Sequence, residues 1–120
     1  MAAKDDLGRA GEDRAARHLV QRGFEILDRN WRAPGGELDL VAARGAELVV
    51  VEVKTRRGDG YGDPLEAVDA RKRSRLWRLA LQWLSAHPDE ARGRTLRIDA
   101  IGITGRDPGT ARLEHLEDVR

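Results

Sequence analysis

Three residues that could carry out metal-assisted chemistry lie close together in the middle of the chain. Asp39 lies near the start of one apolar run, Glu52 lies within the next, and Lys54 follows Glu52 two positions later. Hard divalent cations such as Mg²⁺ prefer oxygen ligands and keep several waters, so two carboxylates and a backbone carbonyl, here that of Val53, would suffice as protein ligands. A lysine beside the ion could orient water or neutralise charge on a phosphate. The pattern favours metal-assisted cleavage of phosphodiester bonds.

A β-hairpin must bring these residues together. Segments 36–41 and 48–56 alternate as strands, and a two-residue loop at Arg44-Gly45 would place Asp39 opposite Val50. Asp39 and Glu52 would then be diagonal neighbours, with backbones about 7–8 Å apart and carboxylates able to converge on one ion. A three-residue loop would instead put them on opposite faces.

The other face of this hairpin is expected to be apolar. A strand pair that is apolar on one side and mixed on the other is usually central and covered by helices on both sides. The apolar face comprises Leu38, Leu40, Ala42, Val49, Val51 and Val53.

The first helix is predicted from about Asp6 to Gly23. Glu12 shares the face that carries Ala16 and Leu19 toward the core. An inward carboxylate is either a satisfied structural group or part of a charged site, and the pattern leaves both open. In the same helix, Gly8 and Gly11 would allow close approach of another backbone or a phosphate.

A second helix is predicted to begin at Asp63 as N-cap, with Pro64 and Glu66 in its first turn, and to run to about His87. Lys72 interrupts its apolar stripe. Its ammonium either reaches solvent or turns toward the charged face of the sheet, and the second is favoured by its position. The other stripe members are Leu65, Val68, Leu76, Leu79, Ala80 and Trp83.

A basic side follows the same helix, although a solvated face is the usual explanation for such a run. Lysine is scarce in this arginine-rich chain, so the positions of Lys54 and Lys72 carry more information than those of single arginines. The candidate nucleic-acid-binding residues are Arg56, Arg57, Lys72, Arg75 and Arg78, with Arg71 and Arg73 on the same side of the helix.

The remaining elements complete an α/β fold. Segment 24–32 reads as a strand, segment 94–104 as a fourth strand, and segment 111–116 as an edge strand. The glycine-rich segment 57–62 is either a mobile substrate-facing loop or an ordinary connector. The order helix, strand, hairpin, helix, strand, strand indicates an α/β sandwich with a mixed sheet.

Composition narrows the class of protein. The 120 residues fit one domain, 1–120, and 40% hydrophobic against 36% charged residues argues for a compact, soluble chain. With no signal peptide or membrane segment, the expected location is the cytoplasm. The absence of cysteine excludes disulfides, thiolate zinc sites and a cysteine nucleophile. A net charge of +1 means that only the distribution of charge could indicate nucleic-acid binding.

A set of short motifs resembles the bacterial YraN family. They are Gly11-Glu12 with Ala15-Ala16 and Leu19, Asn30, Gly36-Glu37-Leu38-Asp39, Val51-Glu52-Val53-Lys54-Thr55-Arg56, Gly62 and Pro64, Glu66-Ala67-Val68, and Lys72. This family is similar to the restriction-endonuclease-like PD-(D/E)xK nucleases and to archaeal Holliday junction resolvases.

That resemblance implies a restriction-endonuclease-like three-layer fold with a mixed central sheet flanked by helices. It further implies metal ligation by Asp39 and Glu52, Lys54 as the catalytic lysine, and Glu12 as an additional acidic residue. In this chain Gly36-Glu37-Leu38 precedes Asp39, where many such nucleases have a proline.

The leading hypothesis is a metal-dependent DNA nuclease that uses Mg²⁺ or Mn²⁺ and is structure-selective and linked to repair or recombination. The alternatives are a DNA-binding accessory module without useful turnover and an interaction domain with a buried ion network. A homodimer would supply the two sites that cleavage of both strands of a duplex or junction usually needs.

Overall fold

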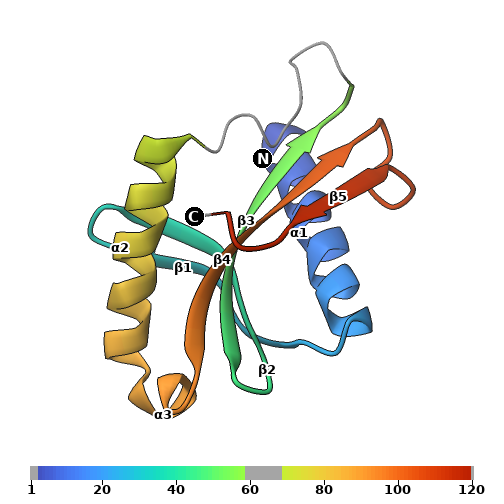
Figure 1. The fold of residues 1–120 in the computed structure, drawn as a ribbon. Coiled ribbons are helices and arrows are strands. Elements are labelled where there is room, and N and C mark those ends of the chain that lie inside the picture. The colour runs from blue at the N-terminus through green and yellow to red at the C-terminus, as the bar shows by residue number, and fades with distance from the viewer. Residues whose placement is uncertain (1–2, 59–68, 120) are drawn as a thin grey trace.

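A five-stranded sheet lies between two long helices. The computed structural model describes residues 3–58 and 69–119. Figure 1 shows α1 and α2 on opposite sides of the sheet, which confirms the predicted α/β three-layer arrangement. The elements are α1 (Ala3–Gln21), β1 (Glu25–Ala33), β2 (Gly36–Arg44), β3 (Glu47–Arg56), α2 (Ala70–Ala86), α3 (Pro88–Ala91), β4 (Thr95–Thr104) and β5 (Arg112–Leu116).

The strands lie in sequence order, β1-β2-β3-β4-β5. Strands β3 and β4 pair in parallel and all other neighbours pair antiparallel, so the sheet is mixed, as predicted. A parallel pair needs a crossover, and here it contains α2 and α3. Among the helices described, none is long and apolar enough to span a membrane.

Each face of the central hairpin packs against one helix. The α1 side contains Leu40, Ala42, Val49 and Val51 with Ala15 and Leu19 of the helix. The α2 side contains Leu38, Val41, Leu48 and Val50 with Leu76, Leu79, Ala80 and Trp83. The hairpin is therefore central and covered on both faces, and the predicted buried stripe of the second helix is confirmed for its four described apolar members.

The expected hairpin register is wrong. Arg44 pairs with Glu47 and Val41 with Val50, so the loop is Gly45-Ala46 and Asp39 does not face Val50. Gly45 has φ +57°, and a turn with positive φ at its first central position favours glycine there. The shift spans two positions of the ladder, so it preserves which residues share a face.

Strand β2 departs from regular alternation beside Asp39. Its pairing with β3 ends at Leu40 opposite Val51, and Leu38 packs with the α2 cluster rather than with Leu40. Asn30, the β1 residue between the pairs that Leu40 and Leu38 make, has φ +52°. The prediction that Leu38 shares the face of Leu40 is wrong because both strands are distorted at this level.

The second helix starts later than predicted. Asp69 has an extended backbone and its carboxylate accepts the amide N–H of Lys72 at 2.9 Å, so it is the N-cap of α2. A continuous helix through Asp69 is therefore wrong. The proposed N-cap Asp63 and the stripe residues Leu65 and Val68 lie outside the described residues.

Only the beginning of the predicted glycine-rich loop, residues 57–58, belongs to the described chain. After α2, the short helix α3 from Pro88 to Ala91 was not predicted.

Close packing of α1 on β3 depends on a glycine. A Cβ placed on Gly11 would lie 1.9 Å from Oγ1 and 2.9 Å from Cβ of Thr55, whereas one placed on Gly8 meets nothing within 4 Å. Gly11 therefore sets the distance at which α1 crosses β3 and, with it, the position of the adjacent Glu12.

We expect Gly11→Ala to destabilise the protein by about 1–3 kcal/mol, because the added methyl overpacks a buried contact. Gly8→Ala is the matched control and should stabilise by about 0.5–1 kcal/mol through helix propensity alone. Urea unfolding of both variants measures the difference, and Thr55→Ala in the Gly11→Ala background should restore part of the loss. Equal effects of the two glycine substitutions would contradict this packing.

Candidate metal centre

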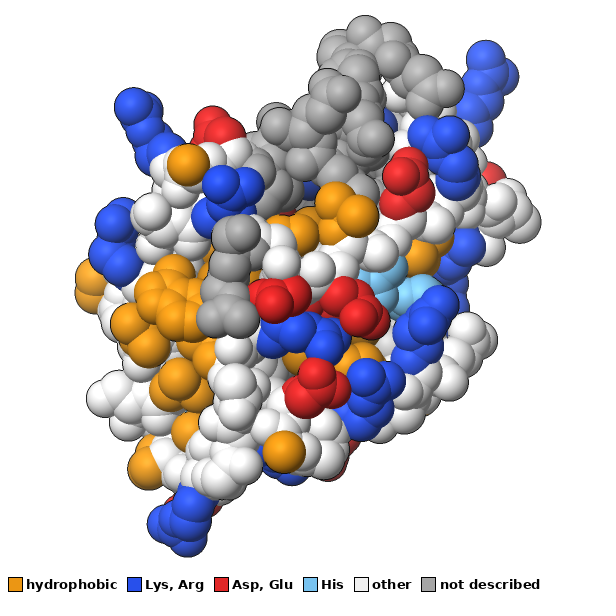
Figure 2. All heavy atoms as spheres, in the orientation of Figure 1, with side chains coloured by type: hydrophobic (Ala, Val, Ile, Leu, Met, Phe, Trp, Pro, Cys, Tyr) orange, Lys and Arg blue, Asp and Glu red, His pale blue; other side chains and the backbone are white. Residues whose placement is uncertain are grey.

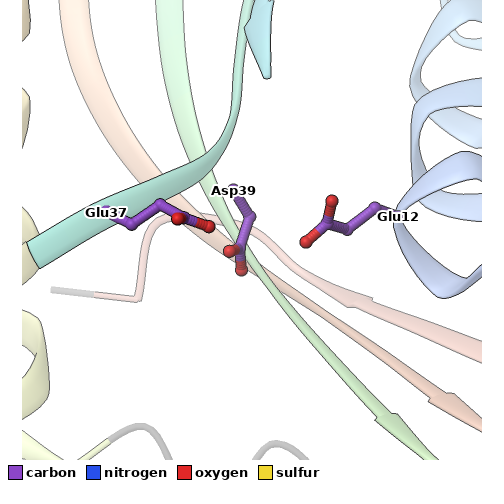
Figure 3. A group of neighbouring side chains, drawn as sticks. All are labelled: Glu12, Glu37 and Asp39. Carbon is purple, nitrogen blue, oxygen red and sulfur yellow. The ribbon is translucent and has the colours of Figure 1, made fainter. Parts of the chain in front are cut away.

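Three carboxylates converge where α1 approaches β2. Glu12, Glu37 and Asp39 each offer an oxygen within 4.8 Å of the others. Figure 3 shows Glu12 reaching from the helix toward Asp39, with Glu37 on the other side of Asp39. The Asn30 amide donates to Glu12 at 2.9 Å and to Glu37 at 3.3 Å. Asn30 therefore combines a positive φ with a side-chain amide that bridges the carboxylates of Glu12 and Glu37.

Asp39 is fixed by the neighbouring strand. Its Oδ2 accepts the backbone N–H of Val53 at 2.8 Å, just beyond the last β2–β3 pair. The side-chain carboxylate thereby replaces the backbone carbonyl that would accept this N–H if β2 and β3 continued to pair. Val53, expected to contribute a carbonyl ligand, is seen here positioning Asp39 through its amide.

Burial, followed by the charge of Glu52, raises the pKa of Asp39 to about 8, although the N–H of Val53 opposes the rise. The charge of Glu12 and a hydrogen bond with Glu52 add to it. The structure therefore brings Asp39 and Glu52 together, as the sequence predicted.

One carboxylate oxygen of Glu52 forms ion pairs with two lysines. Its Oε1 lies 3.2 Å from the ammonium of Lys72 and 3.6 Å from that of Lys54. Lys72 turns toward the sheet, which confirms that interpretation of its position in the apolar stripe. Burial, followed by contact with Lys72, lowers the pKa of Lys54, while Glu52 opposes the change.

The remaining predicted site residues lie in three places. Arg56 and Arg57 join Lys54 and Glu12 in lining a cavity of about 780 Å³. Of the α2 arginines, Arg75 lies beside Gly36 at the start of β2, whereas Arg78 lines a separate groove with Arg73 and Trp77. Arg78 is therefore not gathered with the carboxylates.

Sequence reasoning missed two members of the site. Glu37 and Asn30 were noted only within motifs, yet they complete the carboxylate group and its hydrogen bonding. The spacing of Glu37 and Asp39, two positions apart on a strand, was the available signal for the first. The role of Asn30 depends on the distortion of β1, which the alternation of apolar and polar residues does not reveal.

The donor set fits a hard divalent cation. Carboxylate oxygens are the ligands that Mg²⁺ and Mn²⁺ prefer, and clustered like charges are stabilised by a bound cation. Burial raises the pKa of Glu12 as well, despite the opposing effects of Asn30 and Arg29. Asp39 with Glu12, Glu37 or Glu52 would hold such an ion.

Comparison with known proteins follows the same motifs. A family model described as "Uncharacterised protein family UPF0102" matches residues 11–103. The chain is 52% identical over 116 residues to a UPF0102 protein of Frankia casuarinae, covering 97% of each. It is 50% identical over 119 residues to the UPF0102 protein of Beutenbergia cavernae, covering 99% of each. The predicted resemblance to this family, also called YraN, is confirmed.

The pKa of Asp39 predicts how stability depends on pH. Between the ordinary aspartate value of about 4 and the folded value of about 8, the unfolded chain releases a proton that the folded chain keeps. Unfolding free energy should therefore fall as pH rises through this window, by at most about 1.4 kcal/mol per pH unit. Asp39→Asn, which preserves the acceptor for Val53, should flatten this dependence and be the more stable protein at about pH 8.

Urea unfolding without divalent cations, at several pH values across this window, measures the effect. Asp89→Asn is the control, because that side chain is 85% exposed. Parallel pH profiles for the wild type and Asp39→Asn would show that Asp39 ionises normally.

Proposed function

The chain belongs to the uncharacterised protein family UPF0102, and from its acidic centre we propose that it is a metal-dependent DNA nuclease. The observation that carries this proposal is the convergence of Glu12, Glu37 and Asp39 beside Glu52 and its two lysines. The proposed setting is the cytoplasm, with branched DNA of repair or recombination as substrate. A homodimer would provide a second centre for the opposite strand.

Each residue would have a distinct role. Asp39, with the other carboxylates, would hold Mg²⁺ or Mn²⁺, which supplies polarisation of a phosphate oxygen and acidification of a bound water. Lys54 lies at the cavity and would stabilise negative charge developing on the phosphate. Arg56 and Arg57 line the same cavity and would bind neighbouring phosphates.

The size and lining of the cavity support a polyanionic substrate. A volume of about 780 Å³ accommodates more than an isolated phosphate, and the cavity is lined by three basic side chains and by Glu12 of the carboxylate group. A phosphodiester that bridges the two sets of charges would place its scissile group between the metal ligands and Lys54. This arrangement supports phosphodiester hydrolysis over a purely structural ion network.

We expect purified protein with Mn²⁺ to cleave at least one of linear, flapped and branched DNA. Lys54→Met should lower the rate by at least about 100-fold, because the charge on the phosphate loses its stabilising partner. Arg92→Met removes a cation that is 78% exposed and should leave the rate unchanged. DNA binding by Lys54→Met should largely persist. Binding without cleavage in the wild type would favour the accessory-module alternative.

Lys72 provides a separate test of the metal centre. Its ammonium occupies Glu52 Oε1, so a cation that uses Glu52 must compete with it. Lys72→Met should therefore tighten Mn²⁺ binding about fivefold, the equivalent of about 1 kcal/mol. Calorimetry or metal-dependent thermal stabilisation measures this without any nuclease assay.

Arg75→Met is the matched control, because it removes one positive charge from the next turn of α2, beside Gly36. Equal Mn²⁺ affinity in Lys72→Met and Arg75→Met would mean that Glu52 is not a ligand. If Asp39→Asn still lowers the Mn²⁺ affinity in that case, the ion is bound by Glu12, Glu37 and Asp39 without Glu52.

A further inference from the structure

A polar groove lies between α1 and the segment that connects β4 to β5. We call it the α1–β5 groove, and its volume is about 470 Å³. Its α1 members follow helical spacing, so they form one stripe along that helix. None of the described residues that line it is acidic; they are Arg14, Arg17, His18, Gln21, Gly109 and Leu113.

Arg14 is held rigidly at this groove. Its Nη1 donates to the carbonyls of Pro108 at 2.7 Å and Ala111 at 2.9 Å, on either side of Gly109. These bonds fix the planar guanidinium, whose Nε and Nη2 carry further N–H donors. A guanidinium that is already ordered loses little conformational freedom when it binds an anion.

The hydrogen bonds of His18 determine its tautomer. Arg22 donates from Nε to His18 Nε2 at 3.1 Å, and an arginine nitrogen cannot accept, so His18 Nε2 must be the acceptor. His115 Nδ1 lies 3.0 Å from the same nitrogen. The proton of neutral His18 then resides on Nδ1, and the histidine that lines the groove is a hydrogen-bond donor.

His115 connects His18 to a buried carboxylate. Its Nε2 lies 2.7 Å from Oδ2 of Asp99, a fully buried carboxylate that also accepts from Arg97. Figure 2 shows histidine side chains beside basic ones on this face of the molecule.

The electrostatic environment agrees with this donor set. Burial, followed by the positive charges of His115, Arg22 and Arg14, lowers the pKa of His18. The carboxylate of Asp107, in the same connection, accepts the backbone N–H of Gly109 at 3.0 Å. Positive groups thus outnumber negative ones around the groove, and its side chains mainly donate.

We propose that the α1–β5 groove is a binding site for a phosphate group, held by Arg14, Arg17 and His18. The groove is larger than one phosphate, so the group belongs to a nucleotide or to a nucleic-acid strand. If the strand is the substrate of the proposed nuclease, this inference rests on that function. The phosphate site itself does not, because none of its residues belongs to the carboxylate centre.

The first experiment titrates inorganic phosphate into the full chain and follows the imidazole resonances by NMR. We expect the resonances of His18 to shift, with the Nδ1–H tautomer visible before addition, while those of the distant His87 serve as the internal reference. Arg17→Gln should weaken phosphate affinity about tenfold, since it removes a charged hydrogen-bonding group. Arg9→Gln makes the same change two helical turns earlier on α1 and should have little effect.

Three results would overturn the site: no selective shift of His18, a His18 that carries its proton on Nε2, or equal weakening by Arg17→Gln and Arg9→Gln. The last would indicate general electrostatics rather than a groove.

A second experiment identifies the source of the phosphate by measuring DNA affinity against salt. Loss of one phosphate contact should make the slope of log affinity against log salt shallower by about 0.9 in Arg17→Gln. A shallower slope assigns the groove to a nucleic-acid strand. An unchanged slope with weakened inorganic-phosphate binding supports the site and assigns it to a free phosphate or nucleotide. Neither readout requires cleavage, so a failure of the nuclease proposal can be distinguished from a failure of the phosphate site.

Discussion

The hydrogen bond from the Val53 amide to Asp39 is the interaction on which the acidic centre depends. A regular β2 strand would offer a backbone carbonyl at this level, and its side chains would alternate between the two helices. Here a carboxylate accepts the amide instead, β2 leaves β3 after Leu40, and Asn30 takes a positive φ on the adjoining strand. The distortion opens the sheet where Glu12 arrives from α1, and an acidic cluster lies where the β2–β3 pairing would otherwise continue.

Two aspartates in this protein differ in how far hydrogen bonds and positive charges compensate the burial of their carboxylates. Asp99 accepts from Arg97, His115 and the Asp118 amide, and these bonds lower its pKa although burial alone would raise it. Asp39 receives one amide and faces other carboxylates, and its pKa rises. A structural carboxylate is compensated where it lies, as Asp99 is. Asp39 lacks such compensation, and a carboxylate of this kind is what the proposed cation-binding centre would use.

The sequence was sufficient to predict the layers, the mixed sheet and the approach of Asp39 to Glu52, because strand alternation and helical periodicity are local properties. It failed where geometry depended on another element. The placement of Gly45 in the turn moved the register by two positions of the ladder, and the side change of Leu38 required the distortion at Asn30. Glu37 was missed although its spacing from Asp39 is visible in the sequence, whereas the groove could be found only once the β4–β5 connection was seen to return beside α1.

Helix α1 links the two proposed sites physically. Gly11 lets it lie so close to β3 that Glu12 reaches the carboxylates, while the stripe that begins at Arg14 faces the β4–β5 connection. Arg14 then ties the helix to that connection, and His18 ties it to β5 through His115. A helix held at both places cannot move at one end without disturbing the other. The distance between the carboxylates and the groove is therefore a fixed property of the fold.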